Sequence, residues 1–272
     1  MTSVGDALTS IFDVRDARVL VTGAASGLGL AMAEAMVQAG ARVTLTDVDK
    51  EGLAREVERL NGFAGHAEGE YLDVGDYGAV QETVDRIVRD SGRIDVAFAN
   101  AAGGGMPSDP ADRRVVKALD ASWASEFDVH LGGTVATIQA AARAMVEQRS
   151  GSIVVTSSIS GIRGDHHVPY SYVTIKGAMI NFARQAALEL APHNVRVNVI
   201  APGPFRTNIG AKAAAAGYTT TDDEWARTVA MGRMAEPSEL KGLALLLGSP
   251  AGSYITGAVH VVDGGALLTS AS

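Results

Sequence analysis

Short apolar segments that alternate with longer helical segments restrict the fold of this chain more than any other feature. Several of the short segments are apolar at successive positions, which is typical of strands buried on both faces of a parallel sheet. Segments long enough for a crossover helix lie between them, for example 76–91, 122–148 and 169–191. The predicted strands are RVLVTG (18–23), RVTLTD (42–47), AEGEYLDV (67–74), IDVAFAN (94–100), GSIVVTSS (151–158), VRVNVIAPG (195–203) and GAVHVVDGG (257–265).

This repeated alternation predicts a doubly wound α/β fold, in which helices cover both faces of one parallel sheet of seven strands. The chain has 272 residues, enough for the core of one domain, and no linker or change of composition divides it. We expect a single domain over residues 15–268, after an N-terminal extension over 1–14. Residues 204–235 follow the sixth predicted strand, where a long insertion is typical of a substrate lid.

The composition excludes several kinds of partner and chemistry. A net charge of −8 argues against nucleic acid or an anionic membrane as the main partner. The chain has no cysteine, which excludes a disulfide framework and a thiol nucleophile. No group of His, Asp and Glu has the spacing of metal ligands, so we expect no catalytic metal. The first residues lack the regions of a signal peptide and no apolar segment is as long as a bilayer span, so we expect a cytoplasmic protein.

The glycine-rich motif TGAASGLG joins the first predicted strand to a segment rich in small residues. Gly23 permits a tight turn, Gly27 lets backbone amides approach a pyrophosphate, and Gly29 lets the following helix pack closely on the sheet. An ordinary strand-to-helix turn is the alternative interpretation. The favoured hypothesis is a dinucleotide-binding loop, with contacts from Gly23, Ser26, Gly27, Leu28 and Gly29.

Asp47 ends the second predicted strand, 18 positions after Gly29. A carboxylate there can accept hydrogen bonds from an adenosine ribose 2′-hydroxyl and repels a 2′-phosphate. No basic residue stands in place of Ser26, and Val48 follows Asp47. The sequence therefore favours NAD over NADP. The alternative is that Asp47 caps a helix or lies in a solvated turn.

Tyr170, Tyr172 and Lys176 lie within seven positions of the predicted helix 169–191. Residues four apart share a helix face, so Tyr172 and Lys176 are neighbours whereas Tyr170 points elsewhere. A phenol has a pKa near 10, and a nearby ammonium lowers that pKa. Tyr172 and Lys176 are thus a candidate acid/base pair, although the same spacing also arises by chance on helix surfaces.

Seven short motifs, taken together and in order, resemble those of the short-chain dehydrogenase/reductase family over about residues 15–268. The resemblance implies a single-domain Rossmann fold with strand order 3-2-1-4-5-6-7, and a homotetramer packed through the helices at about 122–148 and 169–191. The motifs are TGAASGLG (22–29), LDV (72–74), NAAG (100–103), SS (157–158), YVTIK (172–176), PGPFRT (202–207) and VDGG (262–265).

The resemblance also implies roles for individual residues. Tyr172 would move the proton to or from the substrate oxygen, Lys176 would lower the pKa of Tyr172 and bind the nicotinamide ribose, and Ser158 would hydrogen-bond the substrate oxygen. Asp73 and Val74 would hold the adenine. The implied cofactor contacts are Asp73, Val74, Asn100, Ala101, Gly103, Tyr172, Lys176, Pro202, Gly203, Phe205 and Thr207.

Two features depart from the family pattern. Ser158 and Tyr172 are 14 positions apart, one more than the commonest family spacing, which indicates one extra residue in GIRGDHHVP. Ser158 is still favoured because it directly follows the strand, with Ser157 and Ser160 as alternatives. His130 stands where the family usually has asparagine. It is a candidate for holding a water beside Lys176 on a proton path, or it only fills space in the helix.

The favoured function is an NAD-dependent oxidoreductase that acts on a secondary alcohol or its ketone. One alternative is a non-catalytic NAD(H)-binding sensor or scaffold, for which the altered His130 is the one favourable feature. Another is a ketoacyl-thioester reductase, against which Asp47 and the acidic net charge count. A mostly apolar substrate pocket is predicted, which favours a neutral and fairly hydrophobic small-molecule alcohol. Its residues would be Gly104, Met106, Ile159, His166, Val168 and Phe205.

The remaining histidines carry weaker signals. His166 and His167 lie in the loop before the predicted catalytic helix, where a solvated polar loop is the alternative to a substrate contact. We expect His66, His193 and His260 to be structural or at the surface.

Overall fold

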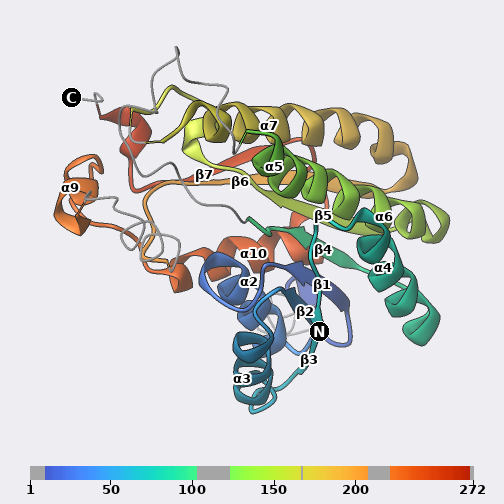
Figure 1. Ribbon diagram of the computed structural model, residues 1–272. Coiled ribbons are helices and arrows are strands. Elements are labelled where there is room, and N and C mark those ends of the chain that lie inside the picture. Colours follow the sequence, from blue (N-terminus) through green and yellow to red (C-terminus); the bar gives the residue numbers. More distant parts are fainter. Residues whose placement is uncertain (1–9, 103–122, 167, 208–220, 270–272) are drawn as a thin grey trace, which may run out of the picture.

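Seven parallel strands form one sheet in the order β3-β2-β1-β4-β5-β6-β7, which confirms the predicted topology. The structure is a computed structural model that describes residues 10–102, 123–166, 168–207 and 221–269 (Figure 1). The strands are β1 (Arg18–Thr22), β2 (Arg42–Asp47), β3 (His66–Tyr71), β4 (Val96–Ala99), β5 (Gly151–Thr156), β6 (Val195–Pro202) and β7 (Val259–Val262).

The helices cover both faces of this sheet (Figure 1). One face carries α2 (Gly27–Gln38), α3 (Lys50–Leu60) and α10 (Lys241–Gly248), and the other carries α4 (Tyr77–Ser91), α6 (Gly133–Gln148) and α7 (Tyr170–Leu190). An apolar cluster fills the space beneath each set.

Strand β1 shows why its residues are apolar at successive positions. Val19 and Val21 belong to the cluster under α2, whereas Leu20 belongs to the cluster under α4, α6 and α7. All three side chains are buried, because successive residues of a strand point to opposite faces and both faces are covered.

The edge strands are shorter than predicted. Strand β3 ends at Tyr71 rather than near residue 74. Beyond it the carboxylate of Asp73 accepts the Gly75 amide at 2.9 Å, and the carbonyl of Asp73 accepts the Asp76 amide at 3.0 Å. These bonds form a turn that ends the strand. Several residues of β3 are exposed, as expected for a strand with a neighbour on one side only.

The predicted helix 122–148 is interrupted in the structure. A short helix α5 (Trp123–Glu126) leads into a π-helical segment, Phe127–Gly132, and then into α6. A π-turn closes i→i+5 hydrogen bonds and thereby holds one residue more than an α-turn. His130 lies within this segment and is buried.

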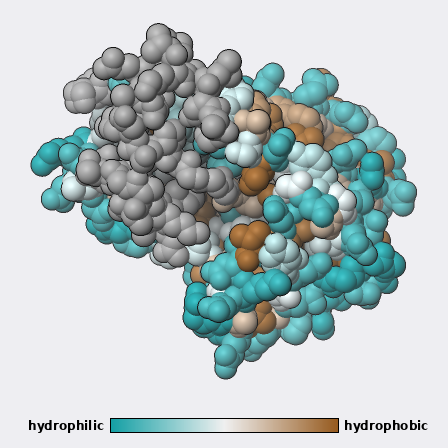
Figure 2. Space-filling view, in the orientation of Figure 1, coloured by the Kyte–Doolittle hydropathy of each residue, from teal (hydrophilic) through white to brown (hydrophobic). Residues whose placement is uncertain are grey.

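The other described elements are short. Helix α9 (Asp222–Arg227) is capped at its N-terminus by Thr221, whose hydroxyl accepts the Glu224 amide at 3.2 Å. Within the described ranges, no helix combines the length and apolar character needed to cross a membrane. The face of the molecule in Figure 2 is largely hydrophilic where it is coloured, with smaller hydrophobic groups among the polar ones.

The topology places the candidate site. The strand order reverses between β1 and β4, so the connections after these two strands leave in opposite directions. In open α/β sheets this reversal leaves a crevice at the carboxyl ends of the strands, where ligands bind.

Substitution of Gly29 tests whether α2 must pack this closely on the sheet. A Cβ at Gly29 would lie 2.1 Å from the Gly23 carbonyl oxygen and 2.5 Å from Nδ2 of Asn100. We expect Gly29→Ala to lower the free energy of unfolding by about 1–3 kcal/mol, because the backbone must shift. Urea unfolding followed by circular dichroism measures the change.

Gly242→Ala is the matched control, because nothing lies within 4 Å of a Cβ at this position in α10. Alanine there should be neutral or stabilising by up to about 1 kcal/mol, through its higher helix propensity. Equal stabilities for the two variants would contradict the packing role of Gly29.

Candidate active site

The glycine loop lies between β1 and α2 and contacts the end of β4. Gly23 and Gly27 have φ angles of +67° and +60°, in the left-handed region that favours glycine. A Cβ at Gly23 would lie 2.7 Å from Cα of Ala101. Ser26 precedes α2 in an extended conformation and makes no side-chain capping bond to it. Leu28 packs against the cluster under α2.

Asn100 braces this loop. Its Nδ2 donates to the carbonyl oxygens of Thr22 at 3.0 Å and Gly23 at 3.2 Å. The hydroxyl of Thr22 accepts the backbone amides of Asn100 and Ala101, both at 3.0 Å. The structure therefore brings together the residues predicted at the ends of β1 and β4. Thr22 was not singled out in the sequence, where a threonine in a strand carries no distinct signal.

Asp47 lies beside the same loop, as its position at the end of β2 predicted. Oδ2 accepts the Ala25 amide at 3.0 Å, and Oδ1 accepts the Asp49 amide at 3.0 Å. The carboxylate thus joins β2 to the glycine loop while it stays half-buried. Val48 is exposed next to it.

The segment after β6 reaches the glycine loop from the other side. A Cβ at Gly27 would lie 3.5 Å from Cβ of Thr207. Pro202 ends β6, and the Gly203 amide donates to the Val262 carbonyl of β7 at 2.9 Å. Phe205 is buried, but it packs in the cluster under α2 and not with Ile159.

These contacts make a cradle that fits a dinucleotide. Glycines stand where side chains would collide with the backbone, a carboxylate lies beside the loop, and the N-terminus of the 12-residue helix α2 follows it. Val74 is buried after β3, and the carboxylate of Asp73 is exposed and accepts the Gly75 amide. Gly103 lies outside the described residues.

The two tyrosines of YSYVTIK lie on different faces of α7, as predicted. Tyr170 is 45% exposed, whereas Tyr172 is partly buried and Lys176 is 3% exposed. Nζ of Lys176 lies 5.6 Å from the centre of the Tyr172 ring. It donates to the carbonyl oxygen of Thr156 at 3.0 Å.

Of the three candidate serines, Ser158 is the one bonded to the tyrosine. Its hydroxyl is hydrogen-bonded to Tyr172. The hydroxyl of Ser157 instead donates to the backbone carbonyl of Lys176 at 2.7 Å. Ser160 donates to Oδ2 of Asp165 at 2.8 Å. The hydrogen bond to Tyr172 thus favours Ser158 over the two alternatives, and the bond from Ser160 brings in Asp165, which sequence reasoning missed.

Burial has the largest influence on the pKa of Tyr172 and raises it. The hydrogen bond from Ser158 opposes this shift in pKa, and the charge of Asp165 adds to it. The sequence predicted that Lys176 would lower the pKa of Tyr172, but in the structure this pKa is raised. The reason is that Lys176 is itself buried at the Thr156 carbonyl, where burial lowers the pKa of its ammonium to about 8.

His130 is buried near Lys176 in the π-helical segment, which packs against α7. Burial, and to a smaller extent the positive charge of Lys176, lower the pKa of its imidazole to about 4. His130 is therefore neutral at pH 7, as a group that both donates and accepts hydrogen bonds must be.

The ends of segment 204–235 are joined to each other. Phe205 forms a parallel bridge with Ala235, and the Arg206 amide donates to the Ala235 carbonyl at 2.9 Å. The Arg206 guanidinium pairs with Asp222 at 3.1 Å and Glu236 at 2.9 Å. Residues 208–220, which form the centre of the predicted lid, lie outside the described residues.

The described part of the substrate side is apolar. Ile159, directly after Ser158, is buried in a cluster with Val229 and Ala266. Val168 is also buried, whereas His166 is exposed. Sequence reasoning did not single out Val229 or Ala266, because small apolar residues in loops give no positional signal. Gly104, Met106 and His167 lie outside the described residues.

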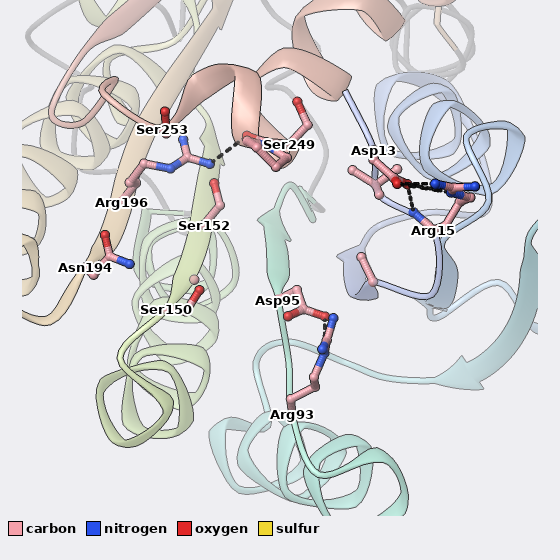
Figure 3. A pocket seen from close by; sticks show the side chains of 15 residues that line it. Asp13, Arg15, Arg93, Asp95, Ser150, Ser152, Asn194, Arg196, Ser249 and Ser253 are labelled. Carbon is pink, nitrogen blue, oxygen red and sulfur yellow. Dashed lines mark hydrogen bonds and ion pairs between the residues drawn. The ribbon is translucent and has the colours of Figure 1, made fainter. Parts of the chain in front are cut away.

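A hollow of about 290 Å³ lies at the amino ends of the central strands, opposite to the carboxyl ends that form the candidate site (Figure 3). Its charged side chains are already satisfied: Arg93 pairs with Asp95 at 2.9 Å, and Arg196 donates to the Leu247 carbonyl at 2.7 Å. None of the predicted site residues lines it. The hollow is therefore separate from the candidate active site.

The remaining predictions concern metal ligands and the other histidines. Among the residues that the structure describes, no three His, Asp or Glu side chains cluster so that they could hold a metal ion. His66 is exposed at the start of β3, and His193 follows α7. His260 lies on β7, where burial lowers its pKa.

Known proteins resemble this chain over almost its whole length. A 3-oxoacyl-[acyl-carrier-protein] reductase of Thermotoga maritima is 34% identical over 92% of this chain and 97% of its own length. A D-threitol dehydrogenase of Mycolicibacterium smegmatis is 35% identical over 93% and 95%. A solved 3-oxoacyl (acyl-carrier-protein) reductase of Agrobacterium tumefaciens C58, with NADP bound, is 30% identical, with a TM-score of 0.85 over 97% and 99%.

The family model described as enoyl-(acyl carrier protein) reductase matches residues 23–266. The chain belongs to the short-chain dehydrogenase/reductase family, as the motifs predicted. Proteins of this family are oxidoreductases that use a nicotinamide cofactor.

Burial of His130 generates a prediction about stability and pH. The unfolded chain takes up this proton below a pKa of about 6.5, whereas the folded protein takes it up only below a pKa of about 4. Between these values unfolding binds a proton, so falling pH destabilises the folded state. The loss is complete below about pH 4 and amounts to about 3 kcal/mol.

Urea unfolding of the wild type and of His130→Asn between pH 4 and pH 7 measures this loss. Other groups contribute equally to both proteins, so the difference between the two curves isolates His130. Parallel curves over the whole range would show that His130 is not buried in its neutral form.

Proposed function

We propose that this protein is an NAD-dependent oxidoreductase that interconverts a secondary alcohol and its ketone. The observation that carries the proposal is the grouping of Tyr172, Ser158 and Lys176 at the carboxyl end of β5. A phenol that shares a hydrogen bond with a serine hydroxyl can bind a carbonyl or alcohol oxygen from two sides. Membership of an oxidoreductase family supports the same reaction class.

The cradle around the glycine loop would hold the cofactor. Backbone amides of the loop and of the α2 N-terminus would bind the pyrophosphate, and Asp47 would accept hydrogen bonds from the adenosine ribose. Asp73, Val74, Asn100 and Thr207 are proposed as further contacts. When bound, the nicotinamide ring accepts or supplies a hydride.

Tyr172 would transfer the proton. Its raised pKa keeps the phenol protonated at neutral pH in this structure, which suits donation to a ketone oxygen as negative charge develops there. Ser158 would hydrogen-bond the same oxygen and orient it. By microscopic reversibility, the same two groups accept the proton when the alcohol is oxidised. Lys176, charged below a pKa of about 8, would favour the phenolate in that direction.

The substrate is proposed to be a neutral alcohol with an apolar part. Ile159, Val229 and Ala266 form an apolar wall next to Ser158. Segment 204–235 is proposed as a lid over this wall, and His130 as the residue that holds a water beside Lys176. A homotetramer formed through α6 and α7 is part of the proposal, and so is the cytoplasmic location.

A ketoacyl-thioester reductase is the second candidate, because reductases of 3-oxoacyl-[acyl-carrier-protein] are among the similar proteins. The two candidates differ in substrate and cofactor. Turnover of a 3-oxoacyl thioester with NADPH, faster than that of any simple ketone with NADH, would favour the second candidate.

Asp47 generates a prediction about cofactor preference. We expect kcat/KM for NAD to exceed that for NADP at least about tenfold, which corresponds to about 1.4 kcal/mol, because the carboxylate repels the 2′-phosphate. Asp47→Ala and Asp47→Asn should narrow the gap, since both remove the charge. Reduction rates of NAD and NADP with one alcohol measure the ratio.

Glu51→Ala is the control for this experiment. It removes an exposed carboxylate near Asp47 and should leave the ratio unchanged. Equal use of both cofactors by the wild type would contradict the assignment of Asp47.

Tyr172 generates a prediction about catalysis. Tyr172→Phe removes one hydroxyl and should lower kcat by at least about 100-fold, the usual contribution of a general acid or base. NADH binding, measured by fluorescence titration, should persist. Tyr170→Phe is the matched control on the same helix and should retain most of the activity, because Tyr170 faces solvent. The reverse result would show that the wrong tyrosine was assigned.

A further inference from the structure

A tyrosine that the proposed reaction does not use packs against the π-helical segment that carries His130. Tyr77, the first residue of α4, donates from its hydroxyl to the carbonyl oxygen of Asp128 at 3.2 Å. The same carbonyl accepts the amide of Gly133, five residues further along the chain, in a bond typical of a π-turn. An α-helical turn would pair this carbonyl with the Gly132 amide instead. Tyr77 therefore bonds to the carbonyl at which the segment departs from a regular α-helix.

Two successive glycines let the π-helical segment lie directly on the turn after β3. A Cβ at Gly132 would overlap the hydroxyl oxygen of Tyr77 and would lie 2.7 Å from its Cζ. A Cβ at Gly133 would lie 2.6 Å from Cγ2 of Val74 and 3.0 Å from the Val74 carbonyl oxygen. A side chain at either position would therefore force the segment and the turn apart.

His130 lies on the other side of the same segment. It stands two positions before Gly132, and residues two apart on a helix point to roughly opposite sides. His130 is 8% exposed and lies close to Lys176 of α7, the helix that packs against the segment. The segment is thus held between Tyr77 on one side and α7 on the other, so the support at Gly132 also determines where His130 lies.

We propose that Tyr77 is a positioning residue for the reaction, because it holds His130 beside Lys176 from the opposite side of the π-helical segment. The inference rests on the proposed function, from which it takes the role of His130 in holding a water. Tyr77 contributes a bond to the widened turn and a ring that fills the space over Gly132. When both are removed, the segment loses this support and His130 moves away from Lys176.

Titration of His130 by proton NMR, without cofactor, tests where this side chain lies. Its signal is the one that the spectrum of His130→Asn lacks. In the wild type the imidazole should titrate with a pKa of about 4. Tyr77→Ala should raise this pKa by at least about one unit, because the imidazole becomes more solvated and lies farther from the Lys176 ammonium. Tyr77→Phe keeps the ring without the bond to Asp128, so it should raise the pKa by less. Tyr254→Ala is the control, because it removes a fully exposed tyrosine and should leave the pKa unchanged.

Gly132→Ala completes a double-mutant cycle on the same contact. Its added Cβ must push against Tyr77, so this variant should also raise the pKa of His130. Combined with Tyr77→Ala it should add little further, because the side chain with which it collides is gone. Additive shifts in the pKa would overturn the positioning role. The titratable groups of the segment and of the elements around it are unchanged in all of these variants: Asp128 in the segment, Glu126 on α5, Tyr172 and Lys176 on α7, and Asp73 and Asp76 in the turn.

Steady-state kinetics test whether Tyr77 acts on turnover through His130. Tyr77→Ala should lower kcat for alcohol oxidation by NAD at least about threefold, and about as much as His130→Ala does. In the His130→Ala background, Tyr77→Ala should have no further effect on kcat. An equal fall in kcat in both backgrounds would overturn the proposal, because Tyr77 would then act by a route that does not involve His130.

The two readouts separate this inference from the proposed function. An unchanged pKa of His130 in Tyr77→Ala would overturn the positioning role, whatever the activity of the variant. Full activity of His130→Ala would overturn the proposed role of that residue, and full activity of Tyr172→Phe would overturn the proposed reaction. In both of these cases the titration still decides whether Tyr77 holds His130 in place.

Discussion

The hydroxyl of Thr22 joins the two strands on which the whole site depends. It accepts the amides of Asn100 and Ala101, and this fixes the end of β1 against the end of β4 where the strand order reverses. Asn100 then holds the glycine loop, and Asp47 holds it from β2. A few backbone-directed bonds thus set the shape of the cradle before any ligand is considered.

The proposed acid/base residues depend on a second contact of this kind, between β5 and α7. The hydroxyl of Ser157 donates to the Lys176 carbonyl, and Nζ of Lys176 donates to the Thr156 carbonyl. These two bonds in opposite directions fix how the helix lies on the strand end, so that Ser158 meets Tyr172. The hydroxyls of Ser158 and Tyr172 are consequently placed in part by Ser157 and Thr156, which have no role in the proposed reaction.

The sequence was sufficient to predict the sheet, its order, and the fact that Tyr172 and not Tyr170 lies beside Lys176, because these follow from periodicity, motif order and helical spacing. It could not predict the π-helical segment at Phe127–Gly132, since an i→i+5 turn has no apolar period of its own. Nor could it predict that the pKa of Tyr172 is raised, because burial decides the direction of this shift. The bond from Ser160 to Asp165 was missed because it depends on side-chain directions that spacing does not report.

The π-helical segment also bears on how this helix tolerates changes in length. Each residue of an α-helix turns the chain by about 100°, and the widened turn at Phe127–Gly132 absorbs one residue without a break in the helix. Removal of one residue there could restore a regular α-helix and leave α6 in place. Everything before the segment would rotate by about 100° relative to α7. The position of His130 beside Lys176 therefore depends on one extra residue in this helix. Deletion of a single residue would separate the two side chains while the sheet stays intact.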